Sequence, residues 1–252
     1  MKDYAPAPDL LKDRVILVTG ASSGLGRLMS LAYASHGATV ALLARDEARL
    51  ESVYDEIVVT GGPEPAIFPF DLAAADDRGM EALAGVIAHH LHRLDGILHS
   101  AYAFNNLCLL HLQTMQQWQA LLQVNLVAPF GLTRACLPLL KNAQDASIIF
   151  TGDTHAHQPA AYWGGYAVAK AGLETLVKIW AEELEQYSHI RMNALIPGAV
   201  ATTLRSRTHP GQLASALPSP SSLIPFYMYL MGPDSRSVRG KILQCPFDDH
   251  AT

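Results

Sequence analysis

Residues 15–26, with the sequence Val-Ile-Leu-Val-Thr-Gly-Ala-Ser-Ser-Gly-Leu-Gly, give the clearest indication of the fold. The apolar run predicts a buried strand, and the glycine-rich turn leads into an amphipathic helix over residues 24–36. Glycines let the backbone turn tightly and approach a pyrophosphate at the positive end of that helix. A dinucleotide site is therefore expected at this turn, formed by Gly20, Ser22, Ser23, Gly24, Leu25 and Gly26.

Short apolar runs alternate with helical segments along the rest of the chain. The pattern predicts helices over residues 46–58, 76–92, 114–140 and 166–187, and strands over residues 39–43, 66–70, 96–98, 147–150 and 190–195 and near Ile242. Such strands need crossover connections, so we expect an α/β fold with a doubly wound parallel sheet (a Rossmann fold) and helices on both faces. Ligands bind these sheets at the carboxyl ends of the strands, where the strand order reverses.

The length of 252 residues favours a single Rossmann-type domain over residues 1–252. A Pro/Ser-rich stretch at residues 208–225 breaks the periodicity, and we expect residues 203–231 to form a substrate lid. An ordinary surface excursion is the alternative. The apolar run at residues 223–231 is too short to span a membrane, so it is predicted to be a packed helix over the lid.

Composition excludes several classes of protein. The formal charge of -5 and the absence of Lys/Arg runs argue against a nucleic-acid partner. The three cysteines, Cys108, Cys136 and Cys245, form no Cys-x-x-Cys pair, which indicates free buried thiols in a reducing compartment. The first residues lack a signal-peptide core, and no run of 18 apolar residues occurs. We expect a cytoplasmic protein with no membrane partner.

Tyr166 and Lys170 lie four residues apart in Gly165-Tyr-Ala-Val-Ala-Lys170 and therefore share one face of the predicted helix. An ammonium beside a phenol is expected to lower the phenol pKa toward a value useful for proton transfer. A Tyr-x-x-x-Lys pair alone is common in helices, where it usually consists of two partly exposed side chains without a catalytic role. Together with the glycine run it indicates an oxidoreductase.

The Gly-x-x-x-Gly-x-Gly spacing and the Tyr-x-x-x-Lys pattern about 140 residues later resemble the short-chain dehydrogenase/reductase family, over nearly the whole chain. Residues 225–236, Trp163-Gly-Gly-Tyr166 and Asp9-Leu-Leu-Lys-Asp13 look like its YciK-like branch in proteobacteria. The resemblance implies that NADPH donates hydride to a carbonyl carbon while Tyr166 protonates the oxygen, and that the same groups run alcohol oxidation. Lys170 would stabilise the tyrosinate and hold the nicotinamide ribose.

The other family landmarks can be placed one at a time. Arg45 ends the second strand, where a guanidinium pairs with a 2′-phosphate, so NADP(H) is preferred over NAD(H); a solvated arginine is the alternative. Asp71 matches the aspartate that contacts the adenine, although it could equally cap the next helix. Asn125 matches an asparagine that holds a water in a proton relay, or it is a buried, hydrogen-bonded amide. The resemblance also implies that the cofactor site is completed by Leu72, Ser100, Ala101, Pro197, Gly198, Val200 and Thr202, and that Thr202 caps a helix.

The family usually has a catalytic serine thirteen residues before the tyrosine, and this sequence has Asp153 there. An ionised carboxylate only accepts hydrogen bonds and repels the negative charge that develops on the substrate oxygen. It should also raise the Tyr166 pKa. Loss of one donor costs about 3 kcal/mol, which predicts a weakened enzyme. Thr154 or Thr151 could supply the hydroxyl, which we favour, or a protonated Asp153 could donate.

A second departure is His99-Ser-Ala-Tyr102, which replaces the family's Asn-Asn-Ala-Gly. The bulk of Tyr102 is expected to narrow the pocket or to stack on a ligand. His155 and His157 beside Asp153 invite a metal interpretation, but no further ligands stand at a recognisable spacing, so no metal is expected.

The leading hypothesis is an NADP(H)-dependent oxidoreductase that interconverts a small-molecule carbonyl and an alcohol. Its catalytic residues would be Tyr166, Lys170, Asn125, Asp153 and Thr154. The rival hypothesis is a catalytically degenerate dinucleotide-binding protein that senses the cofactor or scaffolds a partner. By resemblance, a homodimer or homotetramer is expected.

Overall fold

Seven parallel strands form the centre of the structure, a computed structural model that describes residues 1–247. The strands are β1 (Val15–Thr19), β2 (Thr39–Ala44), β3 (Ala66–Pro69), β4 (Gly96–His99), β5 (Ala146–Thr151), β6 (Ile190–Ile196) and β7 (Ile242–Gln244). Their order across the sheet is β3-β2-β1-β4-β5-β6-β7, and every neighbouring pair is parallel. The predicted doubly wound sheet is confirmed.

The strand order reverses between β1 and β4. From β1 the chain adds β2 and β3 on one side, then returns to add β4 and the later strands on the other. Ile16 of β1 pairs with Val40 of β2 and with Gly96 of β4. The carboxyl ends of β1 and β4 therefore lie side by side, and the crevice between them is where such a fold binds ligands.

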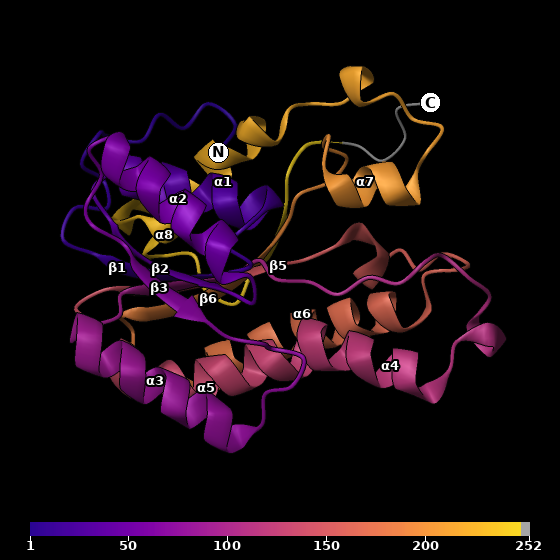
Figure 1. The fold of residues 1–252 in the computed structure, drawn as a ribbon, viewed down its shortest axis with the longest axis horizontal. Coiled ribbons are helices and arrows are strands. Elements are labelled where there is room, and N and C mark those ends of the chain that lie inside the picture. Colours follow the sequence, from indigo (N-terminus) through magenta and orange to yellow (C-terminus); the bar gives the residue numbers. More distant parts are fainter. Residues whose placement is uncertain (248–252) are drawn as a thin grey trace.

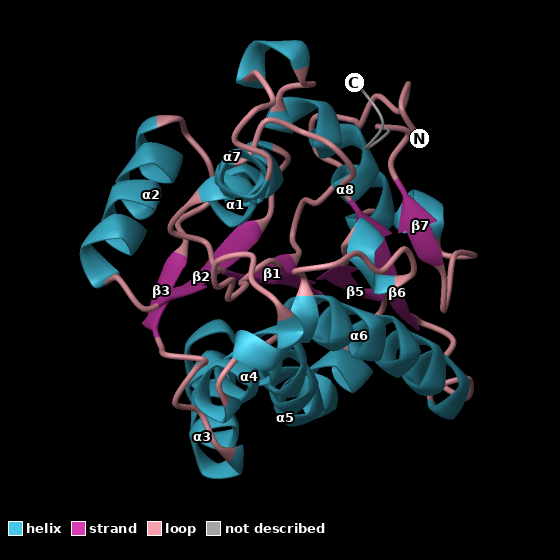
Figure 2. Ribbon diagram, turned by 90° about the vertical axis from the view of Figure 1, so that its right-hand side faces the viewer, coloured by secondary structure: helices cyan, strands magenta, loops and turns pink. Residues whose placement is uncertain are grey.

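Helices cover both faces of the sheet (Figures 1 and 2). One layer contains α1 (Gly24–Ser35), α2 (Glu47–Val59) and α8 (Ile224–Met231). The other contains α3 (Asp77–Leu91), α4 (Met115–Leu122), α5 (Ala128–Asn142) and α6 (Gly164–Glu183). A short helix, α7 (Thr203–Thr208), lies beyond the carboxyl end of β6, across from α4 in Figure 1.

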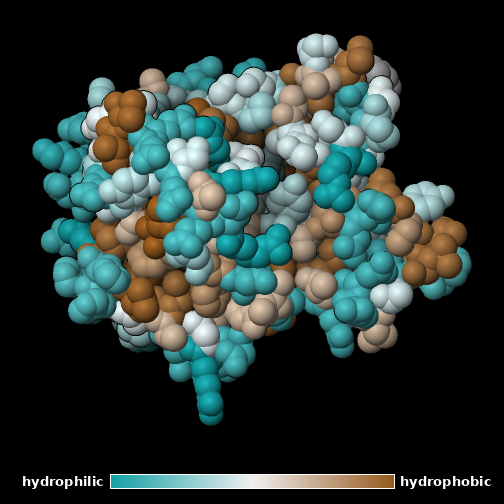
Figure 3. Space-filling model, in the orientation of Figure 1, coloured by the Kyte–Doolittle hydropathy of each residue, from teal (hydrophilic) through white to brown (hydrophobic). Residues whose placement is uncertain are grey.

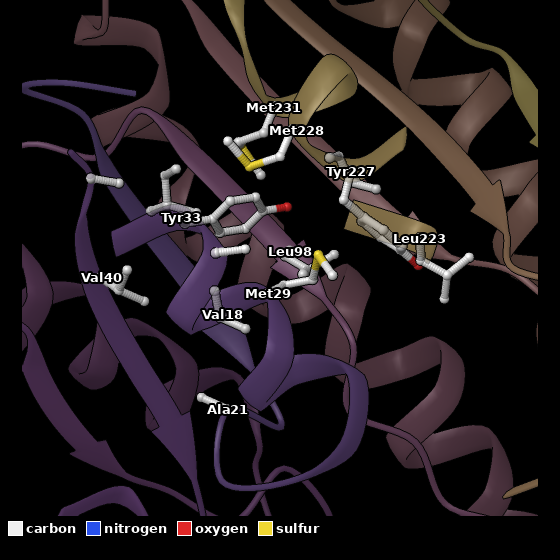
Figure 4. Close-up of a cluster of buried hydrophobic side chains, with 14 of the residues drawn as sticks. Val18, Ala21, Met29, Tyr33, Val40, Leu98, Leu223, Tyr227, Met228 and Met231 are labelled. Carbon is white, nitrogen blue, oxygen red and sulfur yellow. The ribbon is translucent and has the colours of Figure 1, made fainter. Parts of the chain in front are cut away.

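The residues of β1 alternate between two hydrophobic clusters. Ile16 and Val18 pack in the cluster that includes α1 and α8, whereas Val15 and Leu17 pack in the cluster on the opposite face. Figure 4 shows Val18 with Tyr33 of α1 and Tyr227 of α8. Because both faces are covered, the strand is apolar along its whole length, as the sequence pattern indicated.

The predicted helical region over residues 114–140 is present, but it is not α-helical throughout. A π-helical segment, Gln123–Val127, joins α4 to α5, so the chain continues as one helical run over residues 115–142. This run is long and apolar enough, by length and composition alone, to cross a membrane. Its residues Leu132, Cys136 and Leu140 are buried against the sheet, which accounts for much of its apolar character.

The expected lid at residues 203–231 needs a correction. Residues 224–231 form α8, whose side chains Phe226, Tyr227 and Met228 are buried beside α1 rather than placed over a substrate cleft. The predicted packed helix is therefore present, but its expected position over the lid is wrong, because the apolar run completes the core on one face of the sheet. Within residues 203–231, the residues that line the cleft include those of α7 and Leu223.

Candidate active site

A cleft of about 1010 Å³ opens at the carboxyl ends of the strands. It is bounded by the glycine turn, the segments after β4, β5 and β6, and α7, and Figure 3 shows the hollow near the centre of that face. The structure brings together all but one of the predicted site residues, Asn125 being the exception. Those that line the cleft are Gly20, Ser22, Ser23, Gly24, Leu25, Gly26, Arg45, Asp71, Leu72, Ser100, Ala101, Asp153, Thr154, Tyr166, Lys170, Pro197, Gly198, Val200 and Thr202.

The glycine turn leaves room for an anion at the start of α1. A Cβ on Gly26 would lie 2.3 Å from the carbonyl oxygen of Gly20, so only glycine lets the helix approach the turn. The Ser23 side chain makes no capping hydrogen bond, and the first helical turn contains no acidic residue. The N–H groups at this helix end are therefore available to a phosphate group, which the positive end of the helix favours.

Two arginines stand at the carboxyl end of β2. Arg45 is about three-quarters exposed, and its Nε lies 4.0 Å from Oδ1 of Asp71. Arg49, one helical turn further on, also lines the cleft and pairs with Asp46. Asp71 accepts a hydrogen bond from the N–H of Ala73, whereas α3 is capped by Asp76, so Asp71 does not cap the next helix.

Thr19 ties the segment after β4 to β1. Its Oγ1 accepts hydrogen bonds from the N–H groups of Ser100 (3.0 Å) and Ala101 (3.1 Å). His99 before them is buried, stacks on Phe150 and pairs through Nε2 with the Thr133 hydroxyl at 2.8 Å. Burial and the nearby Lys170 lower its pKa to about 3, so His99 is a neutral packing residue.

Tyr166 and Lys170 are buried, and Asp153 is partly buried beside them. The Tyr166 hydroxyl donates a hydrogen bond to Oδ2 of Asp153 at 3.1 Å. Lys170 donates from Nζ to the carbonyl oxygen of Thr151 at 2.8 Å, and the same Nζ lies 5.6 Å from the centre of the Tyr166 ring. The helical spacing therefore places both side chains at the end of β5, as predicted.

The expectation that Lys170 lowers the Tyr166 pKa is wrong in this structure. Burial, the charge of Asp153 and the hydrogen bond to it raise the Tyr166 pKa well above its usual value. The Lys170 pKa falls to about 8, because burial disfavours the ammonium more than Asp153 favours it. Tyr166 is therefore protonated at neutral pH, and the expected effect of Asp153 on it is confirmed.

Asp153 is hydrogen-bonded to His155. Its Oδ1 accepts hydrogen bonds from the backbone N–H of His155 (2.9 Å) and pairs with His155 Nδ1 (2.8 Å). The His155 ring stacks on Trp163, with ring centres 3.5 Å apart. Burial opposes ionisation of Asp153, but these hydrogen bonds and the charge of Lys170 hold its pKa below the usual value. The alternative of a protonated, donating Asp153 is therefore not supported.

The two threonines differ in what they can offer. The Thr151 hydroxyl lies 3.3 Å from the Tyr227 hydroxyl of α8, and the two hydroxyls form a hydrogen bond with each other. Both threonines line the cleft, and Thr154 stands at the start of a short 3-10 helix, Thr154–Ala156. Of the two candidate replacements for the missing serine, Thr154 is therefore the better placed.

Asn125 lies in the π-helical segment and is 1% exposed. Its Nδ2 donates to the carbonyl oxygens of Ala103 (2.8 Å) and Leu121 (2.9 Å), and its Oδ1 accepts from the N–H of Ala103 (3.3 Å). This is the buried, hydrogen-bonded amide considered as the alternative. Its amide fixes the segment after β4 against the α4–α5 run.

The segment after β6 has the predicted geometry. Gly198 has a φ of 71°, and a Cβ there would lie 2.3 Å from the carbonyl oxygen of Phe247. Thr202 caps α7 by accepting a hydrogen bond from the N–H of Arg205 at 3.2 Å. The predicted capping role of Thr202 is confirmed.

Some cleft residues were not predicted as part of the site. Arg49, Phe104, Arg205 and Arg207 line the cleft, and His155 supports Asp153. Arg49 could have been found from its position four residues after Arg45 on a helix. The others lie on segments without periodicity, whose path the sequence pattern does not specify. Among the described residues, no cluster of three or more His, Cys, Asp or Glu side chains could hold a metal ion.

The doubly wound sheet, the glycine turn and the buried Tyr166–Lys170 pair define a Rossmann-type oxidoreductase. The short chain dehydrogenase family profile matches residues 14–212. The chain is 40% identical to the oxidoreductase YciK of Escherichia coli K12, over 94% of this chain and 93% of that protein.

Solved structures agree with this likeness. A short chain dehydrogenase of Pseudomonas syringae superposes with a TM-score of 0.91 and 42% identity, covering 97% of this chain and 99% of that one. A short chain dehydrogenase of Escherichia coli CFT073, complexed with NADPH, gives a TM-score of 0.91 and 39% identity, covering 95% and 99%. The chain belongs to the short-chain dehydrogenase/reductase family, and it is similar to YciK.

Proposed function

We propose that the protein is an NADP(H)-dependent oxidoreductase that interconverts a small carbonyl compound and an alcohol. The observation that carries this proposal is the single cleft that the glycine turn shares with the buried phenol of Tyr166 and ammonium of Lys170. A nucleotide bound along the turn would extend toward the phenol, where its reactive end and a proton donor can act on one substrate.

The residues present fit NADP(H). The pyrophosphate would occupy the space that Gly20 and Gly26 leave at the start of α1, and Asp71 would contact the adenine. Arg45 and Arg49 offer two guanidinium groups where a 2′-phosphate would lie, and no acidic residue takes the place of Arg45. The structural relative complexed with NADPH supports the same choice.

The residues of the chain divide the work of the reaction. NADPH, when bound in the cleft, would supply the hydride that the substrate carbon receives. Tyr166 gives its hydroxyl proton to the substrate oxygen, and Lys170 stabilises the tyrosinate that remains. Thr154 would donate a hydrogen bond to the oxygen, while Asp153 opposes the negative charge there and weakens carbonyl reduction. In alcohol oxidation Tyr166 is the base, and its raised pKa means that little tyrosinate is present at neutral pH.

We also propose a homodimer or homotetramer in the cytoplasm. Apolar side chains on the outer surfaces of α5 and α6, namely Phe130, Val168 and Ile179, are each more than a third exposed and could pack against a second copy. Cys136 and Cys245 are buried free thiols, which suits a reducing compartment.

A second candidate is a degenerate dinucleotide-binding protein that senses the cofactor. The hydrogen bond between Tyr166 and Asp153 favours it, because the phenol is then engaged by a carboxylate rather than left to a substrate. This candidate predicts tight NADPH binding without turnover.

The proposal is tested by following NADPH and NADH oxidation with a panel of ketones, aldehydes, diketones and quinones. We expect turnover with NADPH, and an Arg45→Asp variant should lose at least 10-fold in NADPH affinity while NADH affinity is retained. Equal use of the two cofactors by the native protein would contradict the NADP preference. Tight binding without turnover of any acceptor would favour the cofactor sensor.

A further inference from the structure

The Asp153 carboxylate has two oxygens with different surroundings. Oδ1 is occupied by the backbone and ring N–H groups of His155. Oδ2 accepts the Tyr166 hydroxyl at 3.1 Å, and Asp153 lines the cleft. A carboxylate oxygen can accept more than one hydrogen bond. Oδ2 is therefore the oxygen that can accept a donor from a substrate whose reacting atom meets Tyr166.

The charge at this position suits one kind of double bond better than another. When a ketone accepts hydride, negative charge grows on its oxygen, and an adjacent carboxylate opposes it. A protonated C=N group carries positive charge before hydride arrives and is neutral afterwards, and its N–H donates a hydrogen bond to a carboxylate. The negative charge of Asp153 offsets the positive charge of Lys170. The site therefore lacks the net positive charge with which a lysine alone would stabilise an anion.

We propose that this site reduces imines and iminium ions more readily than ketones, with Asp153 as the group that selects them. The proposal rests on the hydride transfer and the Tyr166 acid of the proposed function and changes only the acceptor. A neutral imine gains the hydride of NADPH at its carbon and one proton from Tyr166 at its nitrogen, so the C=N π bond becomes a C–H and an N–H bond, and solvent restores the proton to Tyr166. An iminium ion has already taken its proton from solvent, so it gains only the hydride and becomes a neutral amine. In both cases NADPH becomes NADP⁺.

Aromatic side chains near the cluster favour a flat substrate. Tyr102 and Phe104 line the cleft, and the Phe104 ring stands at 85° to the Tyr166 ring with centres 5.3 Å apart. Ring faces attract cations, and the Arg207 guanidinium already lies 5.5 Å from the centre of the Phe104 ring. A cyclic imine or amidine would thus meet a carboxylate at its nitrogen and aromatic rings beside it.

Cations on α7 do not cancel the carboxylate. Arg207 is exposed, so water screens its charge, and its Nη2 donates to the carbonyl oxygen of Phe104 at 3.4 Å. Arg205 of α7 is buried and lines the cleft, and its Nε donates to Gln212 at 2.6 Å. Lys170 donates to Thr151 on the β5 side of the cluster. Asp153 is therefore the charged group that is hydrogen-bonded to the Tyr166 hydroxyl.

A binding measurement tests the selection without turnover. Calorimetry on the NADP⁺-loaded protein would compare benzamidine, a flat cation, with benzamide, its neutral counterpart. We expect benzamidine to bind at least 10-fold more tightly to the native protein, and Asp153→Asn to remove that difference. Equal binding of both compounds to the native protein would overturn the proposal, whatever the activity. NADPH affinity of the variants, unchanged if the site is folded, is the control.

Turnover gives the second readout, with 3,4-dihydroisoquinoline and 1-tetralone as acceptors of similar bicyclic shape. The native protein should reduce the imine with a kcat/KM at least 10-fold higher, and Asp153→Ser should reverse the preference. A native protein that prefers the ketone would leave the proposed function standing and overturn this inference. If neither compound is reduced, the proposed function fails for this class of acceptor, and the benzamidine comparison still decides the role of Asp153.

Discussion

A carboxylate at position 153 changes the chemistry available to Tyr166. The phenol is buried, donates to Asp153 and stays protonated at neutral pH, and its raised pKa makes it a weaker acid than a free tyrosine. The helical spacing placed Tyr166 and Lys170 on one face, and the family resemblance placed Asp153 in the same site. Neither identified His155 as the partner of Asp153, because the path of the 3-10 turn decides which nearby side chain reaches the carboxylate.

At this scale, Lys170 predicts a pH-dependent stability. Its pKa is about 8 in the folded protein and about 10.4 in an unfolded chain. Between these pH values the unfolded chain binds the extra proton, so the contribution of Lys170 to the free energy of unfolding rises with pH, by about 3 kcal/mol in total. Urea unfolding of the native protein and of Lys170→Met, from pH 7 to 10, measures it. A difference between the two that stays constant across this range would contradict the prediction.

Asn125→Ala is expected to cost about 1 to 3 kcal/mol, because it leaves Ala103 N–H and the carbonyl oxygens of Ala103 and Leu121 without their partner. Thermal or urea unfolding measures the loss. The same change should loosen the segment after β4, which amide hydrogen exchange at residues 100–107 would detect. Unchanged exchange there would contradict its role as an anchor of that segment.

Among the elements, the junction of β1 and α1 depends most strictly on its residue types. A methyl group on Gly26 would meet backbone that cannot move aside, whereas one on Gly85, in the exposed middle of α3, meets nothing within 4 Å. Gly26→Ala should therefore weaken NADPH binding more than 10-fold and destabilise the fold. Gly85→Ala, the matched control, should stabilise it by up to about 1 kcal/mol. Normal NADPH affinity in Gly26→Ala would contradict this account of the turn.

The elements were predictable where periodicity and turn residues agree. All seven strands follow apolar runs bounded by turn residues or helices, and the glycine turn marked the first junction. The π-helical segment carries no such signal, since a single wide turn leaves the apolar spacing almost unchanged. The placement of α8 in the core rather than over the cleft depends on long-range packing against α1 and β5, which the local sequence does not encode.

For the whole molecule, Asp145 links parts that are distant in the sequence. It pairs with Arg14 before β1 at 2.7 Å and with the buried Arg191 of β6, which also donates to Gly232 at 2.7 Å. Asp145→Ala should lose about 3 to 5 kcal/mol, because Arg191 then remains buried without a carboxylate. The double variant Asp145→Leu with Arg191→Met should lose less than Asp145→Ala in urea unfolding. A larger loss in the double variant would show that the network stabilises through more than charge pairing.

The central step of the proposed reaction is the transfer of a hydride across the cleft to a substrate that Tyr166 protonates. The most direct measurement uses NADPH deuterated at the transferring carbon, with mass spectrometry of the product for the native protein and for Tyr166→Phe. The native protein should place one deuterium on the acceptor carbon. Tyr166→Phe, with unchanged NADPH affinity, should do so about 10² to 10⁴ times more slowly. Equal transfer by Tyr166→Phe, or no deuterium transferred by the native protein to any ketone or imine, would contradict the account.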